Sequence, residues 1–381
     1  MNDTYRPPST KPAALAFLLA FLFFSVAFIV AQTCVITQLC AWMAAQSSQS
    51  APAFADLQIT YDSRIFLRPL QHVLQAFLYL IPFFHTGNIA AIFLTILFAS
   101  LTAGLLILTA QHAGLPRLSG WLLVALFLTS PSVLSAVLSA SGVSILVFFL
   151  ALVFLHLTTW KNHAYWLALV WIGLGVSLAV LAQFSALFFL ILPMLAALVI
   201  AFRHQPENIY YAENALWIML TPLLYVFIVR FFFGYVLEGD PFAFSQFESS
   251  FLQDAPLKQS LALPILPRLA QFFNHTLTYI WLTNPAFTIL SATTLILALV
   301  KRQLFPLVYL LALWVPPLLL RSSAQSGLYD PAAVIANLLL LSSLLLAVAC
   351  AVLLKKNRWI FLLPALLLLA AWNGLQWILV L

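Results

Sequence analysis

Four charged side chains with complementary chemistry lie within 13 residues of one another in this 381-residue sequence: Asp56, Asp62, Arg64 and Arg68. A carboxylate can act as a general base toward a hydroxyl group or hold a divalent metal ion. A guanidinium can grip a phosphate through two parallel hydrogen bonds. The stretch therefore holds the groups needed to activate an acceptor and to bind a phosphate. The same charges would also suit an ordinary solvated loop, and the residue types alone leave both interpretations open.

Two other polar stretches give weaker signals. Glu238-Gly239-Asp240-Pro241 is foremost a turn-forming string, although two carboxylates so close together could bind a metal ion. Arg321 is followed by Tyr329-Asp330-Pro331, where the aspartate could cap a helix. Cys34, Cys40 and Cys350 all lie in apolar runs, so we expect neither a disulfide nor a metal site from them. No cofactor is indicated with certainty, and a divalent metal remains open.

The composition shows what kind of chain must position these groups. Only 7% of the residues are charged and 64% are hydrophobic, including 33 phenylalanines. A soluble domain carries about 25% charged residues, so a water-soluble fold, a disordered chain and a DNA-binding domain are all excluded. Because a membrane-spanning helix takes about 20 apolar residues, the sequence predicts an all-α polytopic membrane protein.

Eleven hydrophobic runs are long enough to be candidate spans. They fall at about 13–40, 88–111, 119–137, 142–159, 164–182, 184–202, 214–233, 285–300, 304–320, 331–353 and 359–379. Two further apolar stretches, 66–84 and 268–282, are interrupted by polar residues, which is typical of helices lying in the membrane interface. The first belongs to a long loop over 44–87 and the second to a long loop over 234–284. We expect one membrane domain over 1–381 and no soluble domain.

The charged residues indicate the orientation of these spans. Alternation places ten basic residues on one side of the membrane and five on the other, and the richer side is normally cytoplasmic. The richer side holds Arg6, Lys11, Arg117, Lys161, Arg203, Lys301, Arg302, Lys355, Lys356 and Arg358, and the other holds Arg64, Arg68, Lys258, Arg268 and Arg321. This bias predicts a cytoplasmic amino terminus, both long loops outside and an outer carboxyl terminus. We expect the membrane to be a bacterial inner membrane.

The spans themselves contain few ionisable groups. Arg230 lies near the outer end of its span, where a long side chain can extend to the surface. No span has Asp or Glu deep inside, as proton relays usually do. The chain also lacks the Gly-x4-Gly-Lys-Ser/Thr motif that cradles nucleotide phosphates. These absences argue against a proton-coupled transporter and an ATP-driven pump.

A series of short motifs begins inside the first long loop and continues along the chain. Arg68-Pro69-Leu70 opens the interfacial stretch and Gly87 precedes the next span. The segments Leu128–Ser132 and Ser139–Ser144 provide a Ser-Pro pair and a turn of small residues. Further along the chain come Val176–Ala186 with Pro193, Arg230–Phe244 with Phe233-Gly234 and Gly239-Asp240-Pro241-Phe242, and Trp314-Val315-Pro316-Pro317.

This order of features resembles the GT-C membrane glycosyltransferases that use polyprenyl-phosphate-linked sugars, such as mannosyltransferase and aminoarabinose-transferase relatives. The resemblance implies a GT-C-like bundle that transfers a sugar from such a donor to an acceptor at the outer face. It implies Asp56 or Asp62 as the base, with a slight preference for Asp56, and Arg64, Arg68 or Arg321 on the donor phosphate. The expected partners are the lipid-linked sugar, the bilayer and a membrane protein, and not nucleic acid.

The chain also departs from the GT-C pattern. It has single acids in the first loop where many relatives have an acidic pair, no acid in the turn near Gly142, and Gln183 where a basic residue is common. These differences keep an alternative open, namely a non-catalytic GT-C-like subunit that scaffolds a partner or binds lipid. A transporter ranks third.

Overall fold

The computed structural model describes the chain over residues 9–33, 69–85, 89–140, 142–163, 166–182, 186–205, 209–238, 277–302, 306–307, 310–311, 313–314, 331–353 and 358–380. All regular structure in these ranges is helical. The helices are α1 (Lys11–Thr33), α4 (Pro69–Tyr79), η2 (Pro82–His85), α5 (Ile89–His112), α6 (Arg117–Leu128), α7 (Pro131–Leu138), α8 (Val143–His163), α9 (Trp166–Ala182), α10 (Ala186–His204), α11 (Ile209–Glu238), α15 (Pro285–Val300), α17 (Pro331–Leu353) and α18 (Arg358–Val380).

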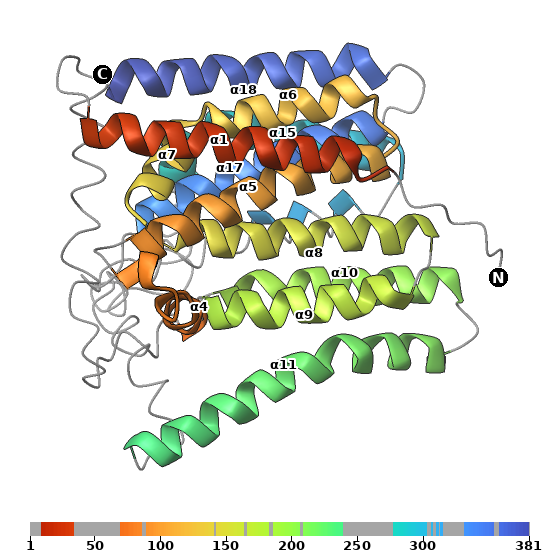
Figure 1. Ribbon diagram of the computed structural model, residues 1–381. Coiled ribbons are helices and arrows are strands. Elements are labelled where there is room, and N and C mark those ends of the chain that lie inside the picture. The colour runs from red at the N-terminus through yellow and green to blue at the C-terminus, as the bar shows by residue number, and fades with distance from the viewer. Residues whose placement is uncertain are drawn as a thin grey trace, which may run out of the picture.

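The long helices run side by side in one bundle (Figure 1). By length and composition, five of the described helices could cross a membrane, or up to seven if each bent pair counts as one span. Helices occupy ten of the eleven predicted runs, and the positions described within the eleventh, 304–320, are also helical. The start of α1 and the end of α18 lie at opposite ends of the bundle. The fold is that of an all-α integral membrane protein.

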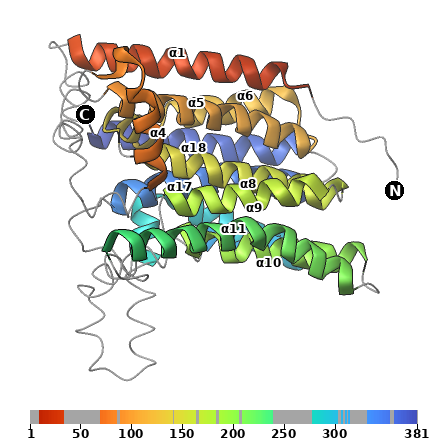
Figure 2. The same ribbon diagram turned by 60° about the horizontal axis from the view of Figure 1, so that its bottom comes forward.

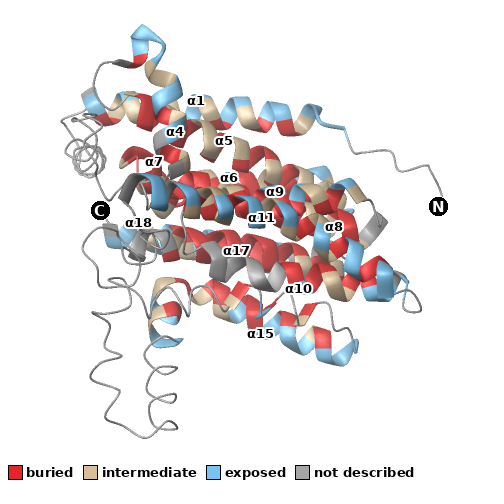
Figure 3. Ribbon diagram, turned by 90° about the horizontal axis from the view of Figure 1, so that it is seen from below, coloured by how far each residue is buried: buried red, intermediate tan, exposed pale blue. Residues whose placement is uncertain are grey.

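Burial separates central helices from peripheral ones (Figure 3). Of the 18 consecutive residues that are most apolar in each helix, 83% are buried in α17 and 78% in both α5 and α8. In α1 and in α11 the buried share is 28%. The peripheral helices present large apolar side chains outward, as expected where the surroundings are lipid chains. Helices approach each other closely through small residues: a Cβ built on Gly173 of α9 would lie only 2.7 Å from the Met219 carbonyl oxygen of α11. Glycine is required there by the close helix contact.

Prolines produce two breaks in the bundle. Pro131 begins α7 directly after Ser130, and α6 and α7 are bent by 58° at that point. Pro285 begins α15, and the side chain of its N-cap residue Asn284 accepts a hydrogen bond from the Phe287 amide at 3.1 Å. The short helix before it, Leu277–Thr283, is bent by 113° from α15. Proline fits the first turn of a helix because its missing N–H would be unpaired there anyway.

α4 runs across the direction of the other helices. Figure 2 shows it almost perpendicular to α5 and α8 at one end of the bundle, which is the end where α18 terminates in Figure 1. It packs against α5 and α9. Together with η2, α4 occupies most of the stretch 66–84 that the sequence predicts as interfacial, and Leu277–Thr283 occupies the end of the second such stretch, 268–282. We call the end of the bundle that carries α4 the α4 end.

Candidate functional site

The five residues predicted to act in transfer, Asp56, Asp62, Arg64, Arg68 and Arg321, all lie outside the residues that the structure describes. Their roles therefore stay predictions. The description of the first loop begins at Pro69, one residue after Arg68, so the site is built here from α4 and its neighbours.

α4 is amphipathic, but its polar face points into the protein. Gln71 and Gln75, one helical turn apart, are only 2% and 1% exposed. Phe77 and Leu80, in contrast, are 65% and 77% exposed, and Val73 also points outward. A helix with this arrangement suits a place at the bundle edge where lipid covers its outer side. The glutamines are thereby buried against α5, α9 and the turn between α7 and α8.

Gln71 fastens α4 to that turn. Its Nε2 donates to the Ala140 carbonyl oxygen at 3.5 Å. Its Oε1 lies against Gly142, where an added Cβ would come within 2.2 Å of it. Gly142 also has φ +71°, a left-handed conformation that side chains disfavour. The small-residue turn noted in the sequence is therefore a docking point for α4.

Gln75 has no such contact. Both of its amide atoms are buried without a hydrogen-bond partner, and so is Oε1 of Gln71. Leaving a buried donor or acceptor unpaired costs about 1–3 kcal/mol per group. Three unpaired polar atoms on one face of a short helix therefore mark a place where the protein alone does not complete the hydrogen bonding.

Arg230 of α11 is close to the same end of α9. It is 7% exposed, and its Nη2 donates to the Val180 carbonyl oxygen at 3.4 Å, in the last two turns of α9. The expectation that its side chain extends to the surface is wrong, because it is held between two helices instead. A cation at the carboxyl end of a helix is favoured by the helix dipole. Arg230 thus places positive charge near the end of the helix against which α4 packs.

Three further hydrogen bonds join the bent helix pairs to neighbouring helices. Asn337 of α17 donates to the Ser132 carbonyl oxygen of α7 at 3.0 Å. Asn284 donates to Ser343 Oγ at 3.2 Å, and Thr95 of α5 donates to the Val137 carbonyl oxygen at 3.2 Å. Because these donors are satisfied by backbone or side-chain acceptors, we interpret them as structural.

An apolar groove of about 800 Å³ opens on the perimeter of the bundle. Its walls are Leu277–Thr283, α15 and the described positions between 307 and 314. Leu277, Trp281, Leu295 and Leu311 line it and are exposed, so the groove faces the surroundings of the bundle. Gln376, in the last two turns of α18, donates to the Thr283 carbonyl oxygen at 3.4 Å. This bond places the wall formed by Leu277–Thr283 toward the α4 end. A groove of this size and character can hold a hydrocarbon chain.

The opposite end of the bundle carries the basic residues. It is the end where α1 and α6 begin and where α8, α10 and α15 end. The basic side chains at these helix ends are Lys11, Arg117, Lys161, Arg203, Lys301 and Arg302. Lys301 donates to the Leu353 carbonyl oxygen at the end of α17. Among the described cations, Arg230 lies instead toward the α4 end. We call the end that carries the other basic residues the basic end.

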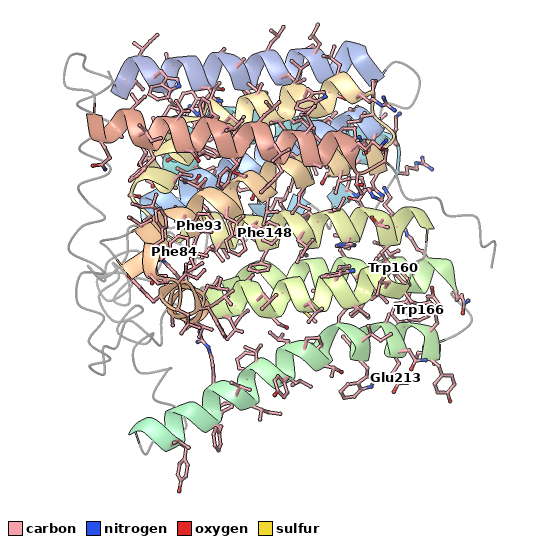
Figure 4. All side chains as sticks on the ribbon, viewed as in Figure 1. Phe84, Phe93, Phe148, Trp160, Trp166 and Glu213 are labelled. Atoms are coloured by element: carbon pink, nitrogen blue, oxygen red, sulfur yellow. The ribbon has the colours of Figure 1, made fainter. Side chains whose placement is uncertain are left out.

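Aromatic clusters mark both ends in Figure 4. At the basic end, Trp166 and Tyr211 lie 4.7 Å apart between ring centroids, and Trp160 donates to the Ala197 carbonyl oxygen at 3.4 Å. At the α4 end, the Phe84 and Phe93 rings lie 5.2 Å apart and join η2 to α5. Tryptophan and tyrosine at helix ends are typical of membrane interfaces. Trp160, Tyr211 and Phe84 are buried, so we interpret both clusters as packing contacts that join neighbouring helices.

Among the residues described, no three His, Cys, Asp or Glu side chains come together to hold a metal ion. Partial burial raises the pKa of the Tyr79 hydroxyl at the end of α4, so this group stays neutral at neutral pH. The side-chain hydrogen-bonding groups described for α4 and the adjoining end of α9 include the carboxamides of Gln71 and Gln75, the Tyr79 hydroxyl and the Arg230 guanidinium.

Sequence reasoning missed Gln71 and Gln75. In the sequence they only mark 66–84 as an interrupted apolar stretch. Their spacing of four residues places both on one face of a helix. That signal was available, but it does not tell whether the face points to water or to protein.

Comparisons with known proteins add little to this description. No protein-family model matches the chain, and no curated protein matches it. Among solved structures, it is similar to the Saccharomyces cerevisiae protein O-mannosyltransferase Pmt1–Pmt2 complex bound to the sugar donor, with 16% identity and a TM-score of 0.40. The alignment covers 62% of this chain and 36% of that one, so the chain spans about a third of its length. A similarity of this size carries no argument about activity.

Proposed function

We propose that this protein is a GT-C-type membrane glycosyltransferase that moves a sugar from a polyprenyl-phosphate-linked donor to an acceptor at the α4 end. The observation that carries the proposal is the apolar groove along α15, which offers a lipid chain a place on the bundle perimeter. The resemblance of the motif order to GT-C enzymes supports it independently. The basic end would face the cytoplasm by the positive-inside bias, and the α4 end would face outward.

The chemistry would use the charged residues of the first long loop. Asp56 or Asp62 would take the proton of the acceptor hydroxyl as its oxygen attacks the anomeric carbon of the sugar. The bond from that carbon to the phosphate oxygen would break, and its electron pair would leave with the polyprenyl phosphate. Arg64, Arg68 or Arg321 would stabilise the charge on that phosphate.

The alternative is a GT-C-like subunit without activity. One observation favours it: the turn Ser139–Ser144 has no acidic residue, and Gln71 packs against it. Such a subunit would still bind lipid or a protein partner at the same surfaces. It would not need the carboxylates of the first loop.

Lipid binding tests the role of the groove. Ala292 lines the groove, and Ala292→Trp should fill part of it and weaken the binding of tritiated undecaprenyl phosphate to the protein in nanodiscs at least about 10-fold, or 1.4 kcal/mol. Leu299→Trp is the matched control, because Leu299 is on the same helix and exposed but does not line the groove. Equal binding by both variants and the wild type would remove the groove from the proposal.

A further inference from the structure

The unpaired atoms of Gln71 and Gln75 require both hydrogen-bond donors and an acceptor from any ligand. Gln75 leaves an acceptor oxygen and a donor NH2 group unpaired, and Gln71 leaves a second acceptor oxygen unpaired. The phosphate of a lipid-linked sugar is a diester and offers only hydrogen-bond acceptors at neutral pH. It could therefore not donate to the two glutamine oxygens. Hydroxyl groups both donate and accept and could satisfy all three atoms.

We propose that Gln71 and Gln75 form a binding site for the hydroxyl groups of a sugar beneath α4. The inference rests on the proposed function, because the sugar would belong to the lipid-linked donor or to a sugar acceptor. It deepens that function by naming residues that recognise the sugar rather than the phosphate.

The position of α4 supports this assignment. Gln71 is held by its own bond to Ala140, so the oxygen beside Gly142 has a fixed place. Gln75 is one turn further along the same buried face. α4 also packs on α9, whose carboxyl end receives the positively charged Arg230.

Gln75→Leu tests the proposal, since it removes the amide while nearly keeping its volume. We would measure the affinity of the full-length protein in nanodiscs for undecaprenyl phosphate and for undecaprenyl phosphates carrying mannose, glucose or aminoarabinose. The wild type should prefer one sugar-bearing lipid, and Gln75→Leu should reduce that preference about 10- to 100-fold, the worth of one or two hydrogen bonds. Affinity for undecaprenyl phosphate should stay unchanged.

Two further measurements keep the result decisive. Gln111→Leu is the matched control, because Gln111 also has a buried, unpaired oxygen but lies in the last turns of α5 at the basic end. The melting temperature of Gln75→Leu without ligand should equal or exceed that of the wild type, since an unpaired buried amide is removed. A merely structural glutamine would instead lower it.

A third arm distinguishes the two sources of the sugar. Methyl glycosides of the same sugars serve as acceptor mimics: loss of their binding in Gln75→Leu, with the lipid preference retained, would place the acceptor's sugar under α4. If both lipid preference and glycoside binding match the wild type, the glutamines bind no sugar and the inference is overturned. If the wild type binds no polyprenyl lipid at all, the proposed function fails, and this inference with it.

Discussion

The contact between α4 and the turn before α8 can be tested by adding a single methyl group at Gly142. An alanine there must adopt φ +71°, and a non-glycine residue in the left-handed region costs about 1–3 kcal/mol. Its Cβ would also lie 2.2 Å from Gln71 Oε1, so the buried amide must move, at a further cost of about 1–3 kcal/mol. We therefore expect Gly142→Ala to lower the free energy of unfolding by about 2–4 kcal/mol, with the two costs relaxing partly together.

A double-mutant cycle separates the two costs. Gln71→Ala loses one long hydrogen bond but also removes an unpaired oxygen, so alone it should change stability by about 1 kcal/mol or less. In the double variant the clash is gone and only the backbone strain remains. The double variant should therefore be more stable than Gly142→Ala alone by about 1–2 kcal/mol.

Reversible unfolding in mixed micelles, followed by circular dichroism or by steric trapping, measures these differences. If the two changes simply add, or if the double variant is the least stable of the three, the described packing of Gln71 on Gly142 is wrong.

Two other predictions concern the bundle as a whole. Gly173→Ala should destabilise the protein by about 1–3 kcal/mol relative to Gly374→Ala, because its Cβ meets backbone of α11 at 2.7 Å, whereas nothing lies within 4 Å of a Cβ at Gly374; equal stabilities would argue against the close approach of α9 and α11. With the native cysteines replaced, a cysteine introduced at Asn162 should react with an impermeant maleimide only after the cytoplasmic side is opened, and labelling from outside would reverse the orientation. Cysteines that should react from outside are those introduced at Ser47, Ser250 and Gly327.

The long helices could be predicted from the sequence because each corresponds to a long apolar run. The run 88–111 corresponds to α5, Ile89–His112, and the run 331–353 to α17 with the same bounds. α11 extends from Ile209 to Glu238, beyond the predicted 214–233, since its ends contain tyrosines and acids that lower hydropathy although the helix continues. The bend at Pro131 interrupts a run that hydropathy alone joins, because proline at a first helical turn changes direction without changing apolar character.

The candidate site was predictable only in part. An interfacial helix within the first long loop follows from the polar interruptions in 66–84, and α4 lies in this stretch. Which face of α4 points inward could not be predicted, because a helix at the bundle edge contacts lipid and protein rather than water and lipid. Arg230 was wrongly assigned to the surface for a related reason: its distance from the helix end does not tell which neighbour it faces. The roles of Asp56, Asp62, Arg64, Arg68 and Arg321 stay predictions.

The central proposal is sugar transfer from a polyprenyl phosphate, and transfer itself is the most direct measurement. Proteoliposomes containing the protein and labelled undecaprenyl-phosphate sugars would be incubated with acceptors extracted from the native membrane, and label leaving the lipid would be counted. The proposal predicts transfer by the wild type and a loss of at least about 100-fold in the variant Asp56→Asn/Asp62→Asn, as expected when a general base is removed. Full transfer by that double variant would contradict it, and the non-catalytic subunit would then take its place.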